Sequence, residues 1–127
     1  MTRSELMARV RSKNTIPELR VRKVVHAAGF RYRLHKKTLP GSPDLVFARL
    51  SIAVFVNGCF WHGHNCKDGA RPASNTEYWD NKINRNIARD KRNIAALRRR
   101  GWRVVVIWTC KLERGITSLL TRLQERI

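Results

Sequence analysis

Two cysteines and two histidines lie within a stretch of eight residues that begins at Cys59 and ends at Cys66. Sulfur and imidazole ligands at this density are typical of tetrahedral zinc sites, and a third thiol, Cys110, ends a later predicted strand. No other feature constrains the fold as strongly, because an ion bound by both segments holds them together. Since His62 and His64 share the same parity, their spacing does not decide which of them is the ligand.

The cysteines have an alternative interpretation. Cys59 and Cys110 can be buried core thiols beside polar loop histidines, although this leaves the clustering unexplained. Three cysteines cannot all pair with one another, which favours metal binding or free thiols over a disulfide framework. The longest apolar runs, 52–56 and 104–108, have five residues each, whereas a membrane span needs about 20. With no secretory signal at the start of the chain, we expect a soluble cytoplasmic protein and no membrane partner.

The chain is strongly basic, with 27 Lys and Arg against 9 Asp and Glu in 127 residues and a net charge of +18. This excess indicates a polyanionic partner, most simply nucleic acid, with a membrane surface as the weaker alternative. Residues 1–37 carry 11 basic and 2 acidic side chains, residues 67–103 carry 11 and 4, and residues 38–66 contain only Arg49 and Asp44. We expect the two basic segments to bind phosphates and the neutral centre to hold the core and the site.

Two helices are predicted in the first 30 residues. Thr15 and Glu18 form a capping box ahead of a helix that Gly29 ends. Before it, Thr2 and Glu5 either cap a short basic helix or belong to a segment that becomes ordered only on DNA.

The later elements follow from apolar patterns and turn residues. Residues 103–108 lack alternation, which suits a buried strand in the middle of a covered sheet. The order α-α-β-β-β-α-β-α predicts one α/β domain, residues 1–127, with a mixed sheet flanked by helices. Its other boundaries are strands at 30–34, 44–50 and 52–56, a tight turn at Asn57-Gly58, a helix from the capping box Ser74/Glu77 to near Gly101, and a last helix over 116–127.

Asp44 follows Pro43 at the head of one predicted strand, and the next strand ends at Val56 and Asn57. A carboxylate in such a setting is a usual place for a divalent ion in folds that cleave phosphodiesters, where hard oxygen ligands hold Mg²⁺. Pro-Asp is also a common turn dipeptide, so the position by itself has two interpretations.

Asp90 interrupts the apolar stripe of the long predicted helix. An ionised carboxylate on a face that meets the core is costly unless it is paired. A nearby histidine would satisfy it and be oriented by it, as in a general base. The alternative, equally supported by the pattern, is a buried aspartate bonded to arginine or backbone. The stripe consists of Ile83, Ile87, Ile94 and Leu97.

Six separate motifs resemble the very-short-patch (Vsr) DNA mismatch repair endonucleases. The resemblance runs in order from about residue 4 to Leu112 and implies a restriction-endonuclease-like PD-(D/E)XK fold with a structural zinc site. The motifs are Met7–Thr15 with Pro17-Glu18, Leu39–Asp44, Asn57–His62, Thr76–Trp79, Arg89-Asp90 and Gly101–Val104.

The same resemblance implies Mg²⁺-dependent nicking of double-stranded DNA 5′ to the thymine of a T:G mismatch. Such mismatches arise by deamination of 5-methylcytosine, so the family usually accompanies a cytosine-5 DNA methyltransferase. Because a nickase needs only one active site for the strand it cuts, we expect a monomer, associated with the nucleoid when bound to DNA.

The resemblance also assigns residues of the active site. Asp44 would bind Mg²⁺, with the backbone carbonyl of Val56 nearby and Glu18 reaching the site from its helix. His62 would be the general base that activates water, held by Asp90. The Zn²⁺ ligands would be Cys59, His64, Cys66 and Cys110.

The resemblance implies DNA contacts in the N-terminal segment and in an aromatic wedge near the middle of the chain. Residues 1–14 would be a basic DNA-contacting segment, with Met7 pressing in from the groove opposite an aromatic wedge. Unstacking a base step costs a few kcal/mol, least where pairing is faulty, so insertion itself favours mismatches. Trp102 and Trp108 are predicted to belong to the core. The implied DNA-binding side chains are Met7, Arg9, Arg11, Lys13, Phe60, Trp61 and Trp79.

Asn57 departs from the family, whose better-known members have a second active-site histidine at this place. Asparagine donates hydrogen bonds to phosphate but carries no charge and exchanges no proton near pH 7. Two alternatives follow: a nuclease of the same fold with a different DNA target, or a catalytically weak zinc-containing protein that binds DNA.

Overall fold

The computed structural model describes residues 2, 4, 5 and 14–127 of the chain. The backbone N–H of Glu5 donates to Oγ1 of Thr2 at 3.1 Å, and the N–H of Thr2 donates to Oε2 of Glu5 at 3.4 Å. These are the two hydrogen bonds of a capping box, as the spacing predicts. The rest of that helix lies outside the described residues, and so do four predicted DNA contacts: Met7, Arg9, Arg11 and Lys13.

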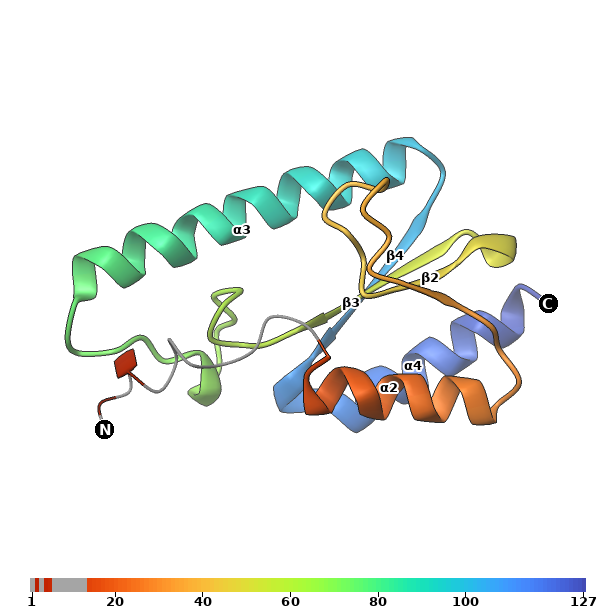
Figure 1. Ribbon diagram of the computed structural model, residues 1–127, viewed down its shortest axis with the longest axis horizontal. Coiled ribbons are helices and arrows are strands. Elements are labelled where there is room, and N and C mark those ends of the chain that lie inside the picture. Colours follow the sequence, from red (N-terminus) through yellow and green to blue (C-terminus); the bar gives the residue numbers. More distant parts are fainter. Residues whose placement is uncertain (1, 3, 6–13) are drawn as a thin grey trace.

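A four-stranded sheet forms the centre of the molecule, in the order β1-β2-β3-β4 (Figure 1). Strand β1 (Arg33–Leu34) pairs antiparallel with β2 (Leu45–Phe47), which pairs antiparallel with β3 (Ile52–Asn57). Strand β4 (Arg103–Trp108) runs parallel to β3. The predicted mixed sheet with flanking helices is therefore confirmed.

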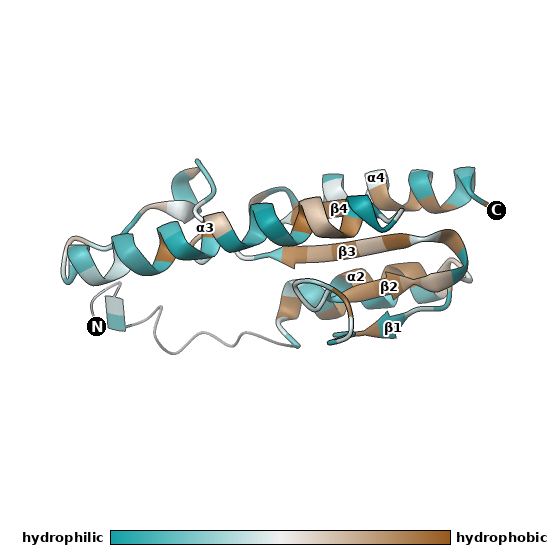
Figure 2. Cartoon of the chain, turned by 90° about the horizontal axis from the view of Figure 1, so that it is seen from above, coloured by the Kyte–Doolittle hydropathy of each residue, from teal (hydrophilic) through white to brown (hydrophobic). Residues whose placement is uncertain are grey.

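Helices cover both faces of this sheet. Helices α2 (Ile16–Ala27) and α4 (Leu112–Glu125) lie together on one face, while α3 (Thr76–Arg99) crosses the other face and extends beyond it (Figures 1 and 2). Within the described part of the chain, none of the helices is long and apolar enough to cross a membrane.

The main core lies between the sheet and helices α2 and α4. Alternate strand residues face it, because successive side chains of a strand point to opposite sides. Burying each such side chain stabilises the fold by about 1.5–3 kcal/mol relative to exposure. The buried members are Val21 and Val25 of α2, Leu45, Phe47, Ile52, Val54, Val105 and Ile107 of the strands, and Ile116, Leu119 and Leu123 of α4.

Strand β4 lies at an edge of the sheet, so its predicted place in the middle is wrong: among the described strands it pairs with β3 alone. Val105 and Ile107 are buried toward α4, whereas Val104 and Val106 are half-buried on the face that α3 covers. The unbroken apolar run thus reflects helices on both faces and contains no information on the number of neighbouring strands.

Other predicted boundaries shift by a few residues. Strand β1 has two residues, and residues 48–50 form a 3-10 turn within the β2–β3 hairpin rather than continuing the strand. The long helix does not begin with a capping box at Ser74: Asn75, at φ 53°, is the N-cap and makes no side-chain capping bond. Asparagine tolerates this left-handed conformation, and Glu77 instead places its charge in the first turn, where the helix dipole favours an anion.

Candidate active site and metal-binding groups

The loop after β3 turns its two histidines in different directions. The N–H of His62 donates to the carbonyl of Gly58 at 3.2 Å, and the N–H of His64 donates to the carbonyl of Cys59 at 3.0 Å. Between them, Gly63 has φ +63°, and a Cβ there would lie 2.4 Å from Cδ1 of Ile87 on α3. Only glycine permits this close approach, which holds the loop against α3.

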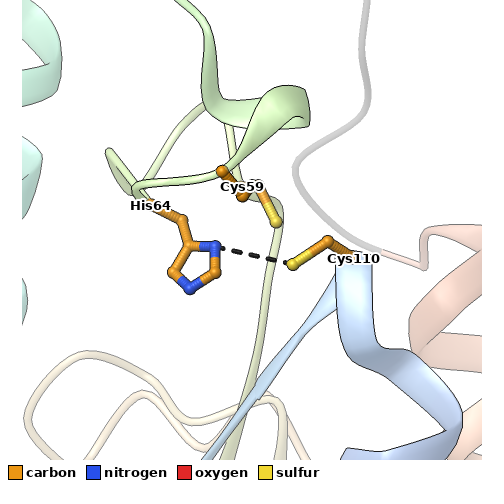
Figure 3. Close-up of side chains that lie close together, drawn as sticks. Cys59, His64 and Cys110 are labelled. Carbon is orange, nitrogen blue, oxygen red and sulfur yellow. Dashed lines mark hydrogen bonds between the residues drawn. The ribbon is translucent and has the colours of Figure 1, made fainter.

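Cys59, His64, Cys66 and Cys110 form what we call the cysteine-histidine group: their ligand atoms all lie within 4.8 Å of one another. Figure 3 shows His64 and the sulfur atoms of Cys59 and Cys110 pointing toward one another, with 3.5 Å between Nδ1 of His64 and Sγ of Cys110. Ligands of one tetrahedral zinc ion lie roughly 3.3–3.8 Å apart, so this donor set fits zinc. His62 points elsewhere, which separates the two histidines that spacing could not.

The three thiols influence each other. Partial burial and the neighbouring sulfur atoms of Cys59 and Cys66 raise the pKa of Cys110 to about 11. Burial opposes ionisation of Cys59 as well, but hydrogen bonds from Thr109, Cys110 and Cys66 outweigh it and lower the pKa of Cys59. Adjacent thiolates repel one another, and a cation between them would relieve this repulsion.

Trp108 is a neighbour of this group that the sequence did not reveal. It is only half-buried, not a core residue, and its ring stacks on that of His64 with 4.2 Å between centroids and 19° between planes. The ring of His62 makes an edge contact with the ring of Trp108, with 6.4 Å between their centroids. A tryptophan two residues before a candidate cysteine ligand is the available signal, but it is also common in a strand.

His62 and Asp90 form a hydrogen-bonded pair across the loop and α3. Nδ1 of His62 lies 2.5 Å from Oδ2 of Asp90, and each side chain is 25% exposed. A carboxylate accepts, so Nδ1 carries the proton in this pair and the other ring nitrogen, Nε2, is left as an acceptor in the neutral ring. Of the two partners that the interrupted stripe left open, histidine or arginine and backbone, the structure gives Asp90 the histidine.

Asp44 lies where the sheet and this pair meet. Its Oδ2 accepts a hydrogen bond of 2.7 Å from the backbone N–H of Val56. Burial raises the pKa of Asp44, although this bond and the charges of His35, His62 and Arg22 oppose the shift. A partly buried carboxylate with incomplete compensation suits a bound cation, and carboxylate oxygen is a ligand that Mg²⁺ prefers.

Glu18 reaches the same place from α2, with its carboxylate 2% exposed. Its backbone N–H donates to Oγ1 of Thr15 at 3.4 Å, one half of the predicted capping box. The carboxylate instead turns inward to an ion pair with Arg22 and to Nε2 of His35, 3.0 Å away. His35 was not singled out by the sequence, because a lone histidine before two lysines has no distinctive pattern.

The predicted wedge residues Phe60, Trp61 and Trp79 form an aromatic cluster with edge contacts of 5.2–5.5 Å between ring centroids. Phe60 and Trp79 are 4% and 3% exposed, while Trp61 is half-buried. Nε1 of Trp79 donates to Oγ of Ser4 at 2.6 Å, so a described residue of the N-terminal segment covers this cluster. Insertion of Phe60 or Trp79 between bases therefore requires the cluster to open.

Two further features bear on nucleic acid. Asn57 ends β3, is 6% exposed and stands beside Trp108 in the β3–β4 register.

Helix α3 presents many cations to solvent and is polar along most of its length (Figure 2). Such a basic helix suits a phosphate backbone. Its exposed cations are Arg85, Arg89, Lys91, Arg92, Arg98 and Arg99.

Comparisons with known proteins agree on one family. Residues 1–68 match the family model described as DNA mismatch endonuclease Vsr. The Type II nicking enzyme V.XorIIP of Xanthomonas oryzae pv. oryzae is 54% identical over 110 residues, which cover 87% of this chain and 81% of that protein. V.NmeAIP of Neisseria meningitidis serogroup A, also named a Type II nicking enzyme, is 44% identical (87% and 79% covered). The DNA mismatch endonuclease Vsr of Escherichia coli K12 is 39% identical, covering 87% and 71%.

Proposed function

Because the chain belongs to the Vsr family of DNA mismatch endonucleases, we propose that it nicks duplex DNA 5′ to the thymine of T:G mismatches left by deaminated 5-methylcytosine. That it is an endonuclease follows from the family. The observation that carries the proposed reaction is the His62–Asp90 pair, at 2.5 Å, near the partly buried carboxylate of Asp44. A base and a cation ligand in one place are what metal-assisted hydrolysis of a phosphodiester needs.

Asp44 and the backbone carbonyl of Val56 would hold Mg²⁺. When bound, Mg²⁺ stabilises the charge that develops on the phosphate oxygens. The hydrogen bond of 2.7 Å from Val56 N–H to Asp44 keeps this backbone beside the carboxylate and fixes the carboxylate's orientation. Glu18, almost fully buried at 2% exposure, adds a second negative charge on the same side.

His62 would act as the general base. Its Nδ1–H is occupied by Asp90, which orients the ring and stabilises the imidazolium that forms when Nε2 takes the proton of the attacking water. The water oxygen then forms a bond to phosphorus as one P–O ester bond of the backbone breaks. Asp90 is a positioning residue in this scheme, since it contacts His62 alone among these groups.

The cysteine-histidine group would hold a structural zinc ion. Three of its four members belong to the loop that also contains His62, and the fourth, Cys110, follows β4. The ion would therefore fix this loop to the end of β4 and keep His62 in place opposite Asp90.

Mismatch selection would fall to the aromatic cluster. Opening that cluster and inserting its rings costs least where a base pair is already weak. Met7 would press in from the opposite groove, Arg9, Arg11 and Lys13 would also contact DNA, and the cations of α3 would bind phosphates. We further propose that the protein acts as a monomer and in association with a cytosine-5 DNA methyltransferase.

A nicking assay tests the proposal. Labelled duplexes with one T:G pair or a T:A pair at the same position are incubated with Mg²⁺. We expect one nick, in the T:G duplex only, with none from Asp44→Ala or His62→Ala. His26→Ala, at an exposed position of α2, is the matched control and should cut as the wild type does. Equal cutting of the paired duplex would contradict mismatch specificity.

A second candidate is a nuclease of this fold with another DNA target, and Asn57 favours it. Its side chain is buried at the end of β3 and cannot become charged. The site therefore lacks a positive charge that a histidine at this position would offer to the substrate. A panel of matched, mismatched and modified duplexes distinguishes the two targets. If the protein binds these duplexes but cleaves none of them, the result supports the other alternative, a catalytically weak zinc-containing DNA-binding protein.

A further inference from the structure

Glu18, His35 and Asp44 form a second group of candidate metal ligands, which we call the carboxylate-histidine group. Their ligand atoms all lie within 4.8 Å of one another. Nε2 of His35 is 3.1 and 3.0 Å from the two oxygens of Glu18 and 3.9 Å from Oδ1 of Asp44. One imidazole nitrogen therefore points between two carboxylates, and the proposed hydrolysis gives it no role.

The backbone holds His35 in this position. Its N–H donates to the carbonyl of Asp44 at 3.2 Å, directly after the β1–β2 pairing, and its φ is +44°. A residue with a Cβ rarely adopts this left-handed conformation, and the surrounding structure must support it. On the far side, Arg22 pairs with Oε2 of Glu18, while both carboxylate oxygens stay within 3.1 Å of Nε2 of His35. The three ligands are thus fixed by separate elements before any ion binds.

We propose that Nε2 of His35 is a metal ligand, so that Glu18, His35 and Asp44 bind a divalent transition-metal ion such as Mn²⁺ more tightly than Mg²⁺. This rests on the proposed function in so far as Asp44 is the metal-binding carboxylate of the nuclease. Mg²⁺ strongly prefers oxygen and keeps its water ligands, whereas imidazole binds transition-metal ions. On binding, Nε2 exchanges its contact with Glu18 for the ion, and both carboxylates remain as oxygen ligands.

The experiment measures metal binding by the full chain without DNA, with its zinc retained. Mn²⁺ is titrated and followed by the electron paramagnetic resonance signal of the free ion, and Mg²⁺ is added as competitor. Spin-echo modulation then detects a coordinated ¹⁴N nucleus on bound Mn²⁺. His35→Asn removes the imidazole and keeps a residue that tolerates positive φ. His26→Asn, on exposed α2, is the matched histidine control.

We expect the wild type and His26→Asn to show coordinated nitrogen and to prefer Mn²⁺. In His35→Asn the nitrogen signal should vanish and Mn²⁺ affinity should fall by about tenfold or more, with Mg²⁺ affinity little changed. Asp44→Asn should lower the affinity for both Mn²⁺ and Mg²⁺. If His35→Asn does not fold, as judged by circular dichroism and zinc content, His35→Gln replaces it.

Two results would overturn the inference: no coordinated nitrogen in the wild type, or a nitrogen signal and an Mn²⁺ preference that persist without His35. The second would mean that His35 only holds Glu18 in place. The outcome is separable from the proposed function, because nicking is not the readout. A chain that binds Mn²⁺ through His35 but never nicks T:G duplexes contradicts the proposed function alone.

Discussion

The two candidate metal-binding groups are assembled in different ways. Three members of the cysteine-histidine group come from one eight-residue stretch, and the fourth follows the neighbouring strand β4. The carboxylate-histidine group takes one residue from α2, one from the chain after β1 and one from the chain before β2. The first can be recognised from spacing, whereas the second exists only once three elements have met.

Their chemistry differs as well, and so does the expected result of damaging each. Sulfur and imidazole suit a structural zinc ion, so loss of a thiol should cost stability. Carboxylates suit a catalytic ion, so changes near Asp44 and His62 should cost reaction rate. Four substitutions test this division.

Cys110→Ser should destabilise the fold more than any other substitution considered. Serine is a poor zinc ligand, and binding of a structural zinc ion contributes on the order of 10 kcal/mol to folding in small zinc domains. Metal analysis should give about one zinc per wild-type chain and much less for the variant, with a large drop in Tm. Mn²⁺ binding should survive at temperatures where the variant is folded. An unchanged Tm after zinc removal would contradict the division.

Asp90→Asn should lower the single-turnover nicking rate by about 10²–10⁴-fold while leaving Tm and DNA affinity close to wild type. An amide stabilises neither the imidazolium of His62 nor the Nδ1–H tautomer. Asp80→Asn is the control on the same helix, since Asp80 pairs with Arg71 at 2.8 Å on the exposed side. Equal rates for the two variants would show that Asp90 does not position His62 for the reaction.

Trp108→Leu should weaken zinc binding by about tenfold, because partners that orient a metal ligand change affinity by this order. The stacked ring, 4.2 Å from His64, restricts the rotation of that imidazole. Competition with a chelator measures the change. Trp102→Leu, just before β4, is the matched control and should leave zinc affinity unaltered. A loss of Mn²⁺ binding in Trp108→Leu would show that the two groups are not independent.

Glu113→Gln should have the smallest effect, because its partner Arg20 lies outside both groups. Oε1 of Glu113 is 2.8 Å from Nη2 of Arg20, and that hydrogen bond lowers the pKa of Glu113 from 4.5. The stabilisation is therefore present above pH 4.5 and is lost as pH falls through the lowered pKa. Urea unfolding of both proteins across pH 3–7 should show a slight gap at neutral pH that closes in acid. A gap that widens in acid would contradict this sign.

The sequence predicted the elements well where local patterns define them. The capping box of Thr15 and Glu18 predicted the start of α2, and the apolar run of 103–108 predicted a strand; both predictions are confirmed. The same run gave β4 the wrong place in the sheet, because coverage by helices hides its edge position. Ser74 failed as a cap since Asn75 adopts the left-handed conformation instead.

At the candidate site, the sequence pointed to Asp44 and Asp90 as carboxylates in unusual positions, and the structure brings each to a partner. It missed His35 and Trp108, because neither stands at a distinctive spacing. The resemblance implied a wedge of Phe60, Trp61 and Trp79, but nothing in their spacing indicates that Phe60 and Trp79 are buried or that Ser4 bonds to Trp79.

Residue types and their local spacing establish the chemistry of this protein: a basic chain of net charge +18, a dense set of thiols and imidazoles, and a carboxylate on an apolar helix stripe. Composition and short-range spacing are enough for these, since they depend on neighbours along the chain. Spacing left open which histidine faces the thiols, and it is the folded chain that turns His64 toward them, turns His62 toward Asp90 and brings His35 between two carboxylates. These choices depend on packing between distant segments, such as the close approach of Gly63 to Ile87 of α3.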